Sequence, residues 1–284
     1  MKVISEQASH PVSDSSAHSV PASSAATDQV LRSDDGPVAT LTINRPGRGN
    51  SITPEAHQAM MRHLAAIRDD KTISVVILTG AGERFFCAGH DLGDVFRSLE
   101  PQAAVDELME GAELARTLRA LPQIVIARVN GIASGAGLQI VAAADLAIAA
   151  GEARFATPGV NIGLWCYGPM VDLGRNVSSK HAMQMLATGR LFDAEFARSI
   201  GLVNEVVARV DLDAAVRTMA MEIAQKSGKT FEMGKPAFYA QLELSREDAY
   251  TYSAEVKARH VTHPDAREGI QAFLDKRKPV WTGR

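Results

Sequence analysis

Cysteine and aromatic residues are scarce in this chain of 284 residues. Its two cysteines, Cys87 and Cys166, are too few for the disulfide framework that holds small secreted domains together. We therefore expect free thiols in a reducing compartment. Aromatic residues make up 5% of the chain and hydrophobic residues 46%, so alanine, valine, leucine and isoleucine must fill a globular core.

An excess of charge of one sign is also missing. Lysine and arginine number 30, aspartate and glutamate 33, and the net charge is -3. Proteins that bind polyanions need a basic surface, so nucleic acid is not an expected partner. The histidines show no spacing typical of metal ligands, and no metal site is expected. We predict that His57 and His63 lie on the surface of a helix.

Long hydrophobic runs are absent too. The most apolar stretch, residues 124–150, is interrupted by Arg128, Asn130, Gln139 and Asp145, so no membrane span is predicted. The opening residues lack the continuous apolar stretch of a secretory signal. Residues 1–28 contain acidic side chains and no arginine, unlike a mitochondrial transit peptide, and we expect a cytoplasmic protein.

The composition changes along the chain and predicts three parts. Residues 1–28 are rich in serine, alanine and proline. Such a segment buries too little apolar surface to offset the entropy cost of ordering, and we predict a disordered tail. Residues 29–209 alternate strand and helix patterns, which indicates an α/β core, and residues 210–284 are predicted to be mainly helical.

The elements of the core follow from the spacing of apolar residues. Continuous apolar runs predict strands buried on both faces, and apolar residues at helical spacing predict amphipathic helices. Strands are expected at residues 38–44, 75–78, 124–129 and 145–149; helices are expected after the caps Thr53, Asp193 and Ser245, within 105–118 and 136–143, and with ends at Gly189 and Gly201.

Two glycine-containing loops follow buried strands and carry the candidate chemistry. In residues 84–92 (RFFCAGHDL), Gly89 lets the backbone turn with its N–H groups exposed. In residues 129–145 (VNGIASGAGLQIVAAAD), a short helix begins near Ala136, and its N-terminus offers unpaired N–H donors. One N–H from each loop, converging on one oxygen, would form an oxyanion hole. The alternative is structural: Asp91 caps a helix, and small residues let a helix pack closely on a sheet.

Two other interpretations of the second loop fail. The segment from Gly135 to Gly137 lacks the third glycine and the later acidic residue of a dinucleotide-binding fingerprint. Residues 131–135 do not match G-x-S-x-G, so Ser134 is no obvious nucleophile.

Three motifs together resemble the crotonase superfamily, the enoyl-CoA hydratase/isomerase proteins. Asn44-Arg45-Pro46 with Asn50 is similar to its N-R-P-x-x-x-N opening. Residues 86–92 are similar to its F-x-A-G-x-D-L loop, and residues 130–145 to its N-G-x-x-x-G-G-G…D segment. The resemblance covers about residues 30–284, and residues 89–92, 138–139, 155–164 and 276–281 are similar to one branch of the superfamily.

The resemblance implies both a fold and an assembly. The fold is an α/β, crotonase-like spiral of ββα units with a C-terminal helical trimerisation region. The assembly is a homotrimer or a dimer of trimers. The apolar stripes at residues 249–256 and 270–273 are more than one protomer is expected to bury.

The resemblance also implies a site for acyl-coenzyme A thioesters. The backbone N–H groups of His90 and Ala136 would form the oxyanion hole, and alanine keeps the N–H although the family usually has glycine there. No separate cofactor is implied, because coenzyme A is part of the substrate. The residues implied to bind that substrate are Arg45, Arg48, Ala88, His90, Asp91, Leu92, Gly135, Ala136 and Lys276.

Two catalytic glutamates of the hydratases are replaced in this chain. Their positions hold Gln139 and Gly159, and neither an amide nor a glycine can exchange a proton, so water activation is expected to fail. Among possible substitutes His90 ranks first, because imidazole transfers protons near neutral pH. Cys166, Tyr167 and Asn161 lie in the loop near the second position, where packing is the expected role of Cys166.

The resemblance therefore implies an acyl-CoA-binding protein of the enoyl-CoA hydratase/isomerase family, a lyase or isomerase of fatty-acid metabolism. It would stabilise a thioester enolate and show little ordinary hydratase activity. The alternative is a non-catalytic acyl-CoA-binding or regulatory protein of fatty-acid metabolism.

Overall fold

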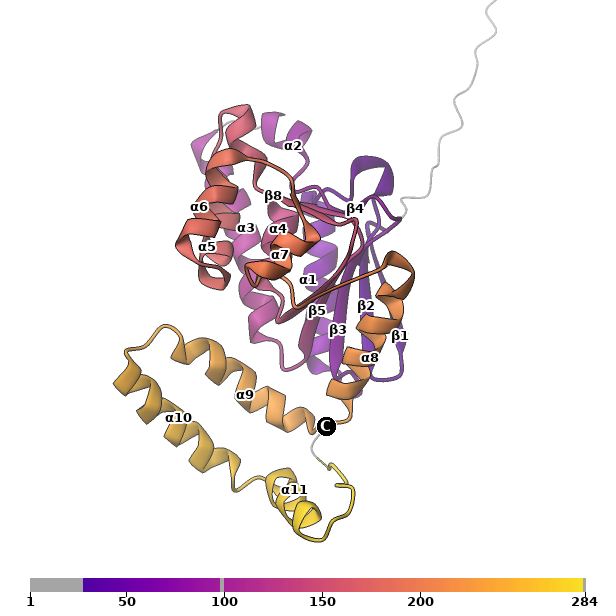
Figure 1. Ribbon diagram of the computed structural model, residues 1–284, viewed down its shortest axis with the longest axis vertical. Helices are drawn as coiled ribbons and strands as arrows, with labels where there is room; N and C mark the ends of the chain where they lie inside the picture. Colours follow the sequence, from indigo (N-terminus) through magenta and orange to yellow (C-terminus); the bar gives the residue numbers. More distant parts are fainter. Residues whose placement is uncertain (1–27, 98–99, 283–284) are drawn as a thin grey trace, which may run out of the picture.

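The computed structural model describes residues 28–97 and 100–282. It contains a six-stranded and a four-stranded β-sheet with helices packed around them, and the last helices of the chain extend at one end (Figure 1). Apart from Asp28, the disordered tail expected at 1–28 lies outside the described residues. None of the helices in the described ranges is long and apolar enough to cross a bilayer.

The larger sheet has six strands in the order β1-β2-β3-β5-β7-β10, and the smaller sheet has four in the order β4-β6-β8-β9. Neighbouring strands pair in parallel except β1 with β2 and β8 with β9. The strands are β1 Val30–Asp35, β2 Val38–Ile43, β3 Val75–Gly80, β4 Phe85–Cys87, β5 Ile124–Val129, β6 Ile132–Ser134, β7 Leu146–Ala150, β8 Arg154–Ala156, β9 Phe192–Asp193 and β10 Glu205–Val207.

The helices connect the two sheets in a repeating order. They are α1 Pro54–Asp69, α2 Leu92–Arg97, α3 Pro101–Ala120, α4 Ala136–Ala143, α5 Tyr167–Asn176, α6 Ser179–Thr188, α7 Ala194–Ser199, α8 Leu212–Ala224, α9 Gly228–Gln241, α10 Arg246–His260 and α11 Pro264–Leu274, with 3-10 turns η1 Pro46–Arg48, η2 Pro158–Ile162 and η3 Arg209–Asp211. A strand of the large sheet, a short strand of the small sheet and one or two helices follow each other three times: β3-β4-α2-α3, β5-β6-α4 and β7-β8-α5-α6. This is the spiral of ββα units that the sequence resemblance implies.

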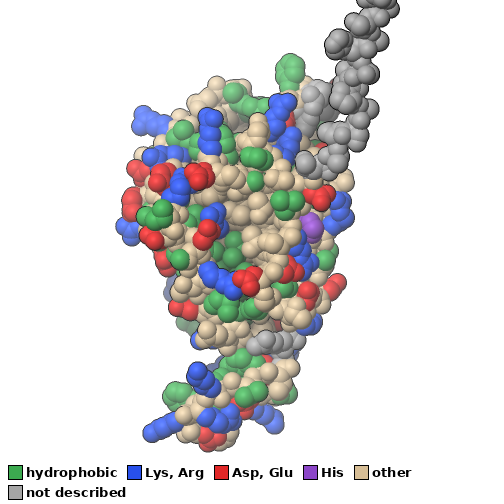
Figure 2. Space-filling model, turned by 90° about the vertical axis from the view of Figure 1, so that its right-hand side faces the viewer, with side chains coloured by type: hydrophobic (Ala, Val, Ile, Leu, Met, Phe, Trp, Pro, Cys, Tyr) green, Lys and Arg blue, Asp and Glu red, His purple; other side chains and the backbone are tan. Residues whose placement is uncertain are grey.

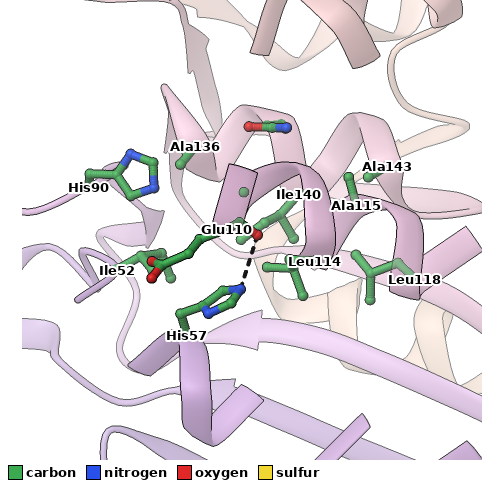
Figure 3. Close-up of a pocket in the computed structure, with 12 residues that line it drawn as sticks. Ile52, His57, His90, Glu110, Leu114, Ala115, Leu118, Ala136, Ile140 and Ala143 are labelled. Carbon is green, nitrogen blue, oxygen red and sulfur yellow. Dashed lines mark hydrogen bonds between the residues drawn. The ribbon is translucent and has the colours of Figure 1, made fainter. Parts of the chain in front are cut away.

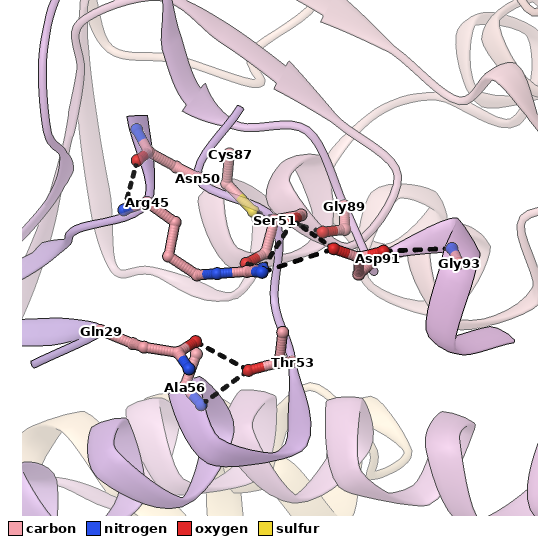
Figure 4. A network of polar contacts seen from close by, with 10 residues as sticks. All are labelled: Gln29, Arg45, Asn50, Ser51, Thr53, Ala56, Cys87, Gly89, Asp91 and Gly93. Atoms are coloured by element: carbon pink, nitrogen blue, oxygen red, sulfur yellow. Dashed lines mark hydrogen bonds and ion pairs between the residues drawn. The ribbon is translucent and has the colours of Figure 1, made fainter. Parts of the chain in front are cut away.

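Local sequence signals set several element boundaries. Thr53 caps α1 by accepting a hydrogen bond from the Ala56 N–H, and Pro54 occupies the first turn (Figure 4). Gly189 ends α6 in the left-handed region at φ 59°, as the expected C-terminal glycine. Ser245 caps α10 through the Asp248 N–H. These three predictions are confirmed.

Aliphatic and alanine side chains fill the core, as the low aromatic content predicts. β3 and β5 are the central parallel strands, and all six residues of β3 are buried. Phe86 and Phe155 are the largest of the fully buried side chains. Both cysteines are free thiols, and burial raises the pKa of Cys87 to about 12, so Cys87 is an unreactive core residue.

The C-terminal helices divide differently from the predicted boundary at residue 210. Leu212, Val216 and Ala220 of α8 are buried in a cluster with residues of the large sheet, so α8 belongs to the core. The last three helices, α9, α10 and α11, form the lower part of Figures 1 and 2, and α9 docks on the core through the buried Lys235. α10 buries none of its residues. Large apolar side chains on these helices are exposed: Phe238, Tyr250, Ile270, Phe273 and Leu274.

Candidate active site

The two glycine loops of the sequence meet in the fold. Gly89 has φ +106°, a backbone conformation that residues other than glycine rarely adopt. A Cβ on Gly89 would lie 3.1 Å from the Ser134 carbonyl oxygen and 3.4 Å from the Ala136 nitrogen. The loop after β4 therefore contacts the N-terminus of α4 directly, at a distance that glycine permits.

Gly137, the second residue of α4, also lets the strand β4 and the start of α4 approach closely. A Cβ there would lie 2.1 Å from the Cys87 carbonyl oxygen, closer than any real contact. The structural interpretation, that small residues allow close packing, is therefore correct for Gly137. It does not compete with an oxyanion hole, because the same close approach brings the two candidate amides together.

The amides of His90 and Ala136 have no hydrogen-bond partner among the described residues. The Ile52 N–H donates to the Gly89 carbonyl at 2.8 Å, and the Asp91 N–H donates to the Ile52 carbonyl at 3.1 Å, so these bonds fix the chain on both sides of His90. Ala136 is the first residue of α4, whose early N–H groups have no partner within the helix. Both amides are thus available to one negative oxygen.

Polar contacts hold the loop after β4 in place (Figure 4). The Arg45 guanidinium donates to the Ser51 carbonyl and hydroxyl at 2.8 Å each and lies 3.4 Å from an Asp91 carboxylate oxygen. Asp91 also accepts from the Gly93 N–H at 3.1 Å, the helix-capping role that its spacing suggests. This hydrogen bond, aided by Arg45, holds the pKa of Asp91 below its usual range. Arg45 and Asp91 thus stiffen the loop that carries the oxyanion donor.

A pocket that is partly open to solvent lies beside these amides (Figure 3). Its walls come from the segment before α1, from α1, the loop after β4, α3 and α4. The lining residues are Ile52, His57, His90, Glu110, Gly111, Leu114, Ala115, Leu118, Ala136, Gln139, Ile140 and Ala143. Most of them are apolar, as in sites that bind organic ligands.

The prediction that His57 lies on the surface is wrong. His57 is buried, and its Nε2 donates to the Glu110 backbone carbonyl at 3.0 Å. A carbonyl only accepts, so Nε2 carries the proton. The burial of His57 against α3 could not be predicted from α1 alone. The apolar stripe of a helix does not show how far a neighbouring helix covers the edges of that stripe. His63 is half-buried.

Gln139 is buried and lines the pocket, and a hydrogen bond fixes its orientation. Its Nε2 donates to an Asp172 carboxylate oxygen at 2.9 Å, and the other Asp172 oxygen lies 2.8 Å from the Arg119 guanidinium. The Gln139 Oε1 faces Gly111 and Gly168, where Cβ atoms would approach it to 3.4 and 2.8 Å. At this position the pocket therefore has a neutral amide and no carboxylate.

Gly159 stands in η2, and lack of space explains the glycine. A Cβ would lie 2.9 Å from the Leu164 carbonyl oxygen and 3.1 Å from the Cys166 sulfur. The Gly159 N–H donates to that sulfur at 3.4 Å. Cys166 is half-buried against this turn, so it has a packing role.

His90 forms an ion pair that sequence spacing does not reveal. Its Nδ1 lies 2.5 Å from an oxygen of Glu107 on α3. This hydrogen bond lowers the pKa of Glu107 although partial burial opposes the shift. On α3 the sequence indicated only the apolar stripe, so Glu107 and Glu110, one helical turn apart on the side toward His90 and the pocket, were missed.

The remaining predicted site residues lie outside the pocket. Ala88 and Gly135 belong to the two loops, and their N–H groups donate to Gly49 and Ala156 carbonyls. Arg48 and Leu92 are exposed. Lys276 is exposed just after α11, at the end of the molecule opposite α2, so one chain does not bring it to the pocket. Tyr167 and Asn161 are exposed, and Asn161 donates to the Gly189 carbonyl.

Several known proteins are similar to this chain over most of its length. A family model described as enoyl-CoA hydratase/isomerase matches residues 34–284. Enoyl-CoA hydratase domain-containing protein 3, mitochondrial, from Xenopus laevis is 36% identical over 253 residues, which cover 89% of this chain and 85% of that protein. Carnitinyl-CoA dehydratase from Salmonella typhi is 34% identical over 255 residues, 88% of this chain and 97% of that protein.

Solved structures show the same relationship. The enoyl-CoA hydratase of Mycobacterium smegmatis matches with a TM-score of 0.86 and 38% identity, over 89% of this chain and 98% of that chain. Human enoyl Coenzyme A hydratase domain-containing protein 3 matches with a TM-score of 0.86 and 32% identity, over 89% and 100%. The branch that residues 89–92 and 155–164 resemble is that of domain-containing protein 3, and the comparisons confirm it.

The relatives establish the family of this chain but not its location in the cell. The Xenopus relative is named as mitochondrial, so a cytoplasmic location of this chain stays a prediction. The family model and both relatives cover most of the chain. The chain belongs to the enoyl-CoA hydratase/isomerase family.

Proposed function

We propose that this protein binds an acyl-CoA thioester and stabilises the negative charge that develops on the thioester oxygen. The observation that carries the proposal is the pair of unpartnered amides, His90 and Ala136, on two loops in contact beside an apolar pocket. Preorganised backbone donors of this kind favour an enolate or a tetrahedral oxyanion over the neutral carbonyl. The names of two relatives, enoyl-CoA hydratase and carnitinyl-CoA dehydratase, refer to CoA thioesters, which supports that substrate class.

The alternative is a protein that binds acyl-CoA without converting it, in a regulatory role in fatty-acid metabolism. Gln139 and Gly159 favour it, because neither can exchange a proton at the two positions where the family resemblance implies glutamates. Incubation with a panel of acyl-CoA esters, followed by mass spectrometry of the products, separates the two. Binding with no product from any ester would favour the alternative.

Binding itself is tested by thermal unfolding. Crotonyl-CoA at about 100 times its Kd should stabilise the fold by about 2.7 kcal/mol through mass action, which raises the Tm by about 5–10 °C in a protein of this size. Gly89→Ala should abolish this ligand-induced rise, because its Cβ would displace the Ser134–Ala136 turn.

The matched control is Gly174→Ala in α5, where a Cβ would meet nothing within 4 Å. This variant should keep the full ligand-induced rise. Absence of any rise in the wild type would contradict the proposal.

We also propose that the chain self-associates as a homotrimer or a dimer of trimers. The exposed apolar side chains of α9–α11 support this, since a solitary protomer would leave Phe238 and Phe273 in water. Light scattering at micromolar concentration should give at least three times the chain mass of 30.4 kDa. Phe273→Glu should lower the measured mass, and a wild-type mass of one chain would contradict the proposal.

A further inference from the structure

The pair formed by His90 and Glu107 fixes which nitrogen of the imidazole is a base. Glu107 is held ionised by the hydrogen bond, and a carboxylate can only accept, so the proton of the neutral ring lies on Nδ1. The Nε2 atom then carries a lone pair. It has no hydrogen-bond partner among the described residues.

The ring of His90 lines the same pocket as the proposed oxyanion hole. The backbone N–H of His90 is one of the two proposed oxyanion donors, and its side chain lines the pocket together with Ala136 (Figure 3). A thioester whose oxygen accepts from these amides would have its acyl group in the pocket that the imidazole lines. Positioning of a base and an oxyanion hole around the same substrate is the arrangement that enolisation requires.

Few other groups in the pocket can take up a proton. Gln139 is an amide. The Nε2 of His57 donates to the Glu110 carbonyl, which leaves a lone pair on its Nδ1, but among the described residues no carboxylate pairs with this ring to stabilise a charged form, as Glu107 does for His90. The one other ionisable side chain among the lining residues is the carboxylate of Glu110, which in Figure 3 extends from α3 toward Ile52. Glu110 forms no ion pair or side-chain hydrogen bond in the described structure, so nothing fixes its direction. His90 is held in place and Glu110 is not.

We propose that His90 Nε2 removes a proton from the α-carbon of a bound acyl-CoA, and that Glu107 is the positioning residue that orients the ring and stabilises its charged form. The inference rests on the proposed thioester-binding function. The C–H bond breaks, its electron pair moves onto the thioester oxygen as an enolate, and the amides of His90 and Ala136 stabilise that oxygen. The imidazolium then exchanges its proton with solvent and returns one to carbon. The step is reversible, needs no further reactant and does not add water.

The experiment uses the full-length protein with butyryl-CoA in D2O. Butyryl-CoA is saturated, so it cannot be hydrated and reports enolisation alone. Mass spectrometry should show up to two deuterium atoms entering at the α-carbon, well above the rate without protein. His90→Ala keeps the backbone N–H and should lower the exchange rate by about 10²–10⁴-fold, the usual contribution of a general base.

Glu107 is tested by separating binding from turnover. Glu107→Ala should lower kcat for exchange by at least about tenfold while KM is unchanged, because the ring loses its orientation and its counter-charge and the thioester keeps its amides. A merely structural role would change KM or the Tm instead. Glu113→Gln, an exposed carboxylate on the same helix, is the matched control and should leave the rate unchanged.

Each outcome decides the question. Exchange that survives in both His90→Ala and Glu107→Ala overturns the proposal, and if it is lost in Glu110→Gln it identifies Glu110 as the base. Wild-type protein that gains thermal stability with butyryl-CoA but catalyses no exchange overturns this inference and leaves the binding function standing. Absence of both the stabilisation and the exchange overturns the binding function as well.

Discussion

Wild-type protein should hydrate crotonyl-CoA about 10⁴-fold more slowly than enzymes with typical kcat values of about 1–10³ s⁻¹. Hydration needs one group that takes a proton from water and a second that delivers one to the α-carbon. Gln139 and Gly159 supply neither, and the proposed base on His90 supplies one. The rate is measured by loss of the conjugated thioester absorbance, with binding confirmed in the same sample by thermal unfolding.

Restoring the two glutamates should not restore hydration. Gly159→Glu puts a Cβ 2.9 Å from the Leu164 carbonyl, so the 158–166 turn must move. Gln139→Glu puts a second carboxylate at the 2.9 Å contact with Asp172, and two like charges at that distance cannot both stay ionised. The control for this repulsion is the double variant Gln139→Glu with Asp172→Asn. Its asparagine amide donates a hydrogen bond to the new carboxylate, so the two side chains no longer repel each other. Wild-type hydration at ordinary enzymatic rates would contradict this argument.

Asp145→Ala should lower the free energy of unfolding by about 3–5 kcal/mol, the cost of removing one partner from a buried ion pair. Asp145 lies 2.6 Å from the Lys235 ammonium, and the side chains are 10% and 4% exposed. Asp145 also accepts from the Val125 N–H and the Tyr239 hydroxyl at 2.7 and 2.8 Å. Burial lowers the pKa of Lys235, although Asp145 opposes that shift. Without Asp145 this ammonium stays buried next to α3 and β5 with carbonyl partners alone, from Leu118 and Gln123.

Urea unfolding measures the loss, with two matched variants. Glu195→Ala removes an exposed partner of Arg198 and should cost less than about 1 kcal/mol. Lys235→Met added to Asp145→Ala removes both buried charges and should recover most of the loss. A decrease below about 1 kcal/mol in Asp145→Ala would show that the pair contributes little to the docking of α9 on the core.

Short elements of the small sheet escape prediction from sequence for a physical reason. β4, β6 and β8 have three residues each, too few for a period of two to be distinguished from chance. Their order is set by pairing with one another across the spiral. β1 escapes for a different reason: its sequence VLRSDD has one buried residue, Val30, because it is the edge strand and pairs with β2 alone.

The sequence by itself determined the local features of this protein: the caps at Thr53 and Ser245, the buried central strands, the two glycine loops and, through their motifs, the family. Each of these depends on interactions among neighbouring residues or on a spacing that one segment carries. Tertiary structure alone decided that Gly89 contacts the Ser134–Ala136 turn, that α3 brings Glu107 to His90, and that Gly159 has no room for a side chain. Those contacts join segments that are far apart in the sequence and meet only when the two sheets and their connecting helices pack together. The free energy of that packing comes from the whole core, so no single segment of sequence reveals it.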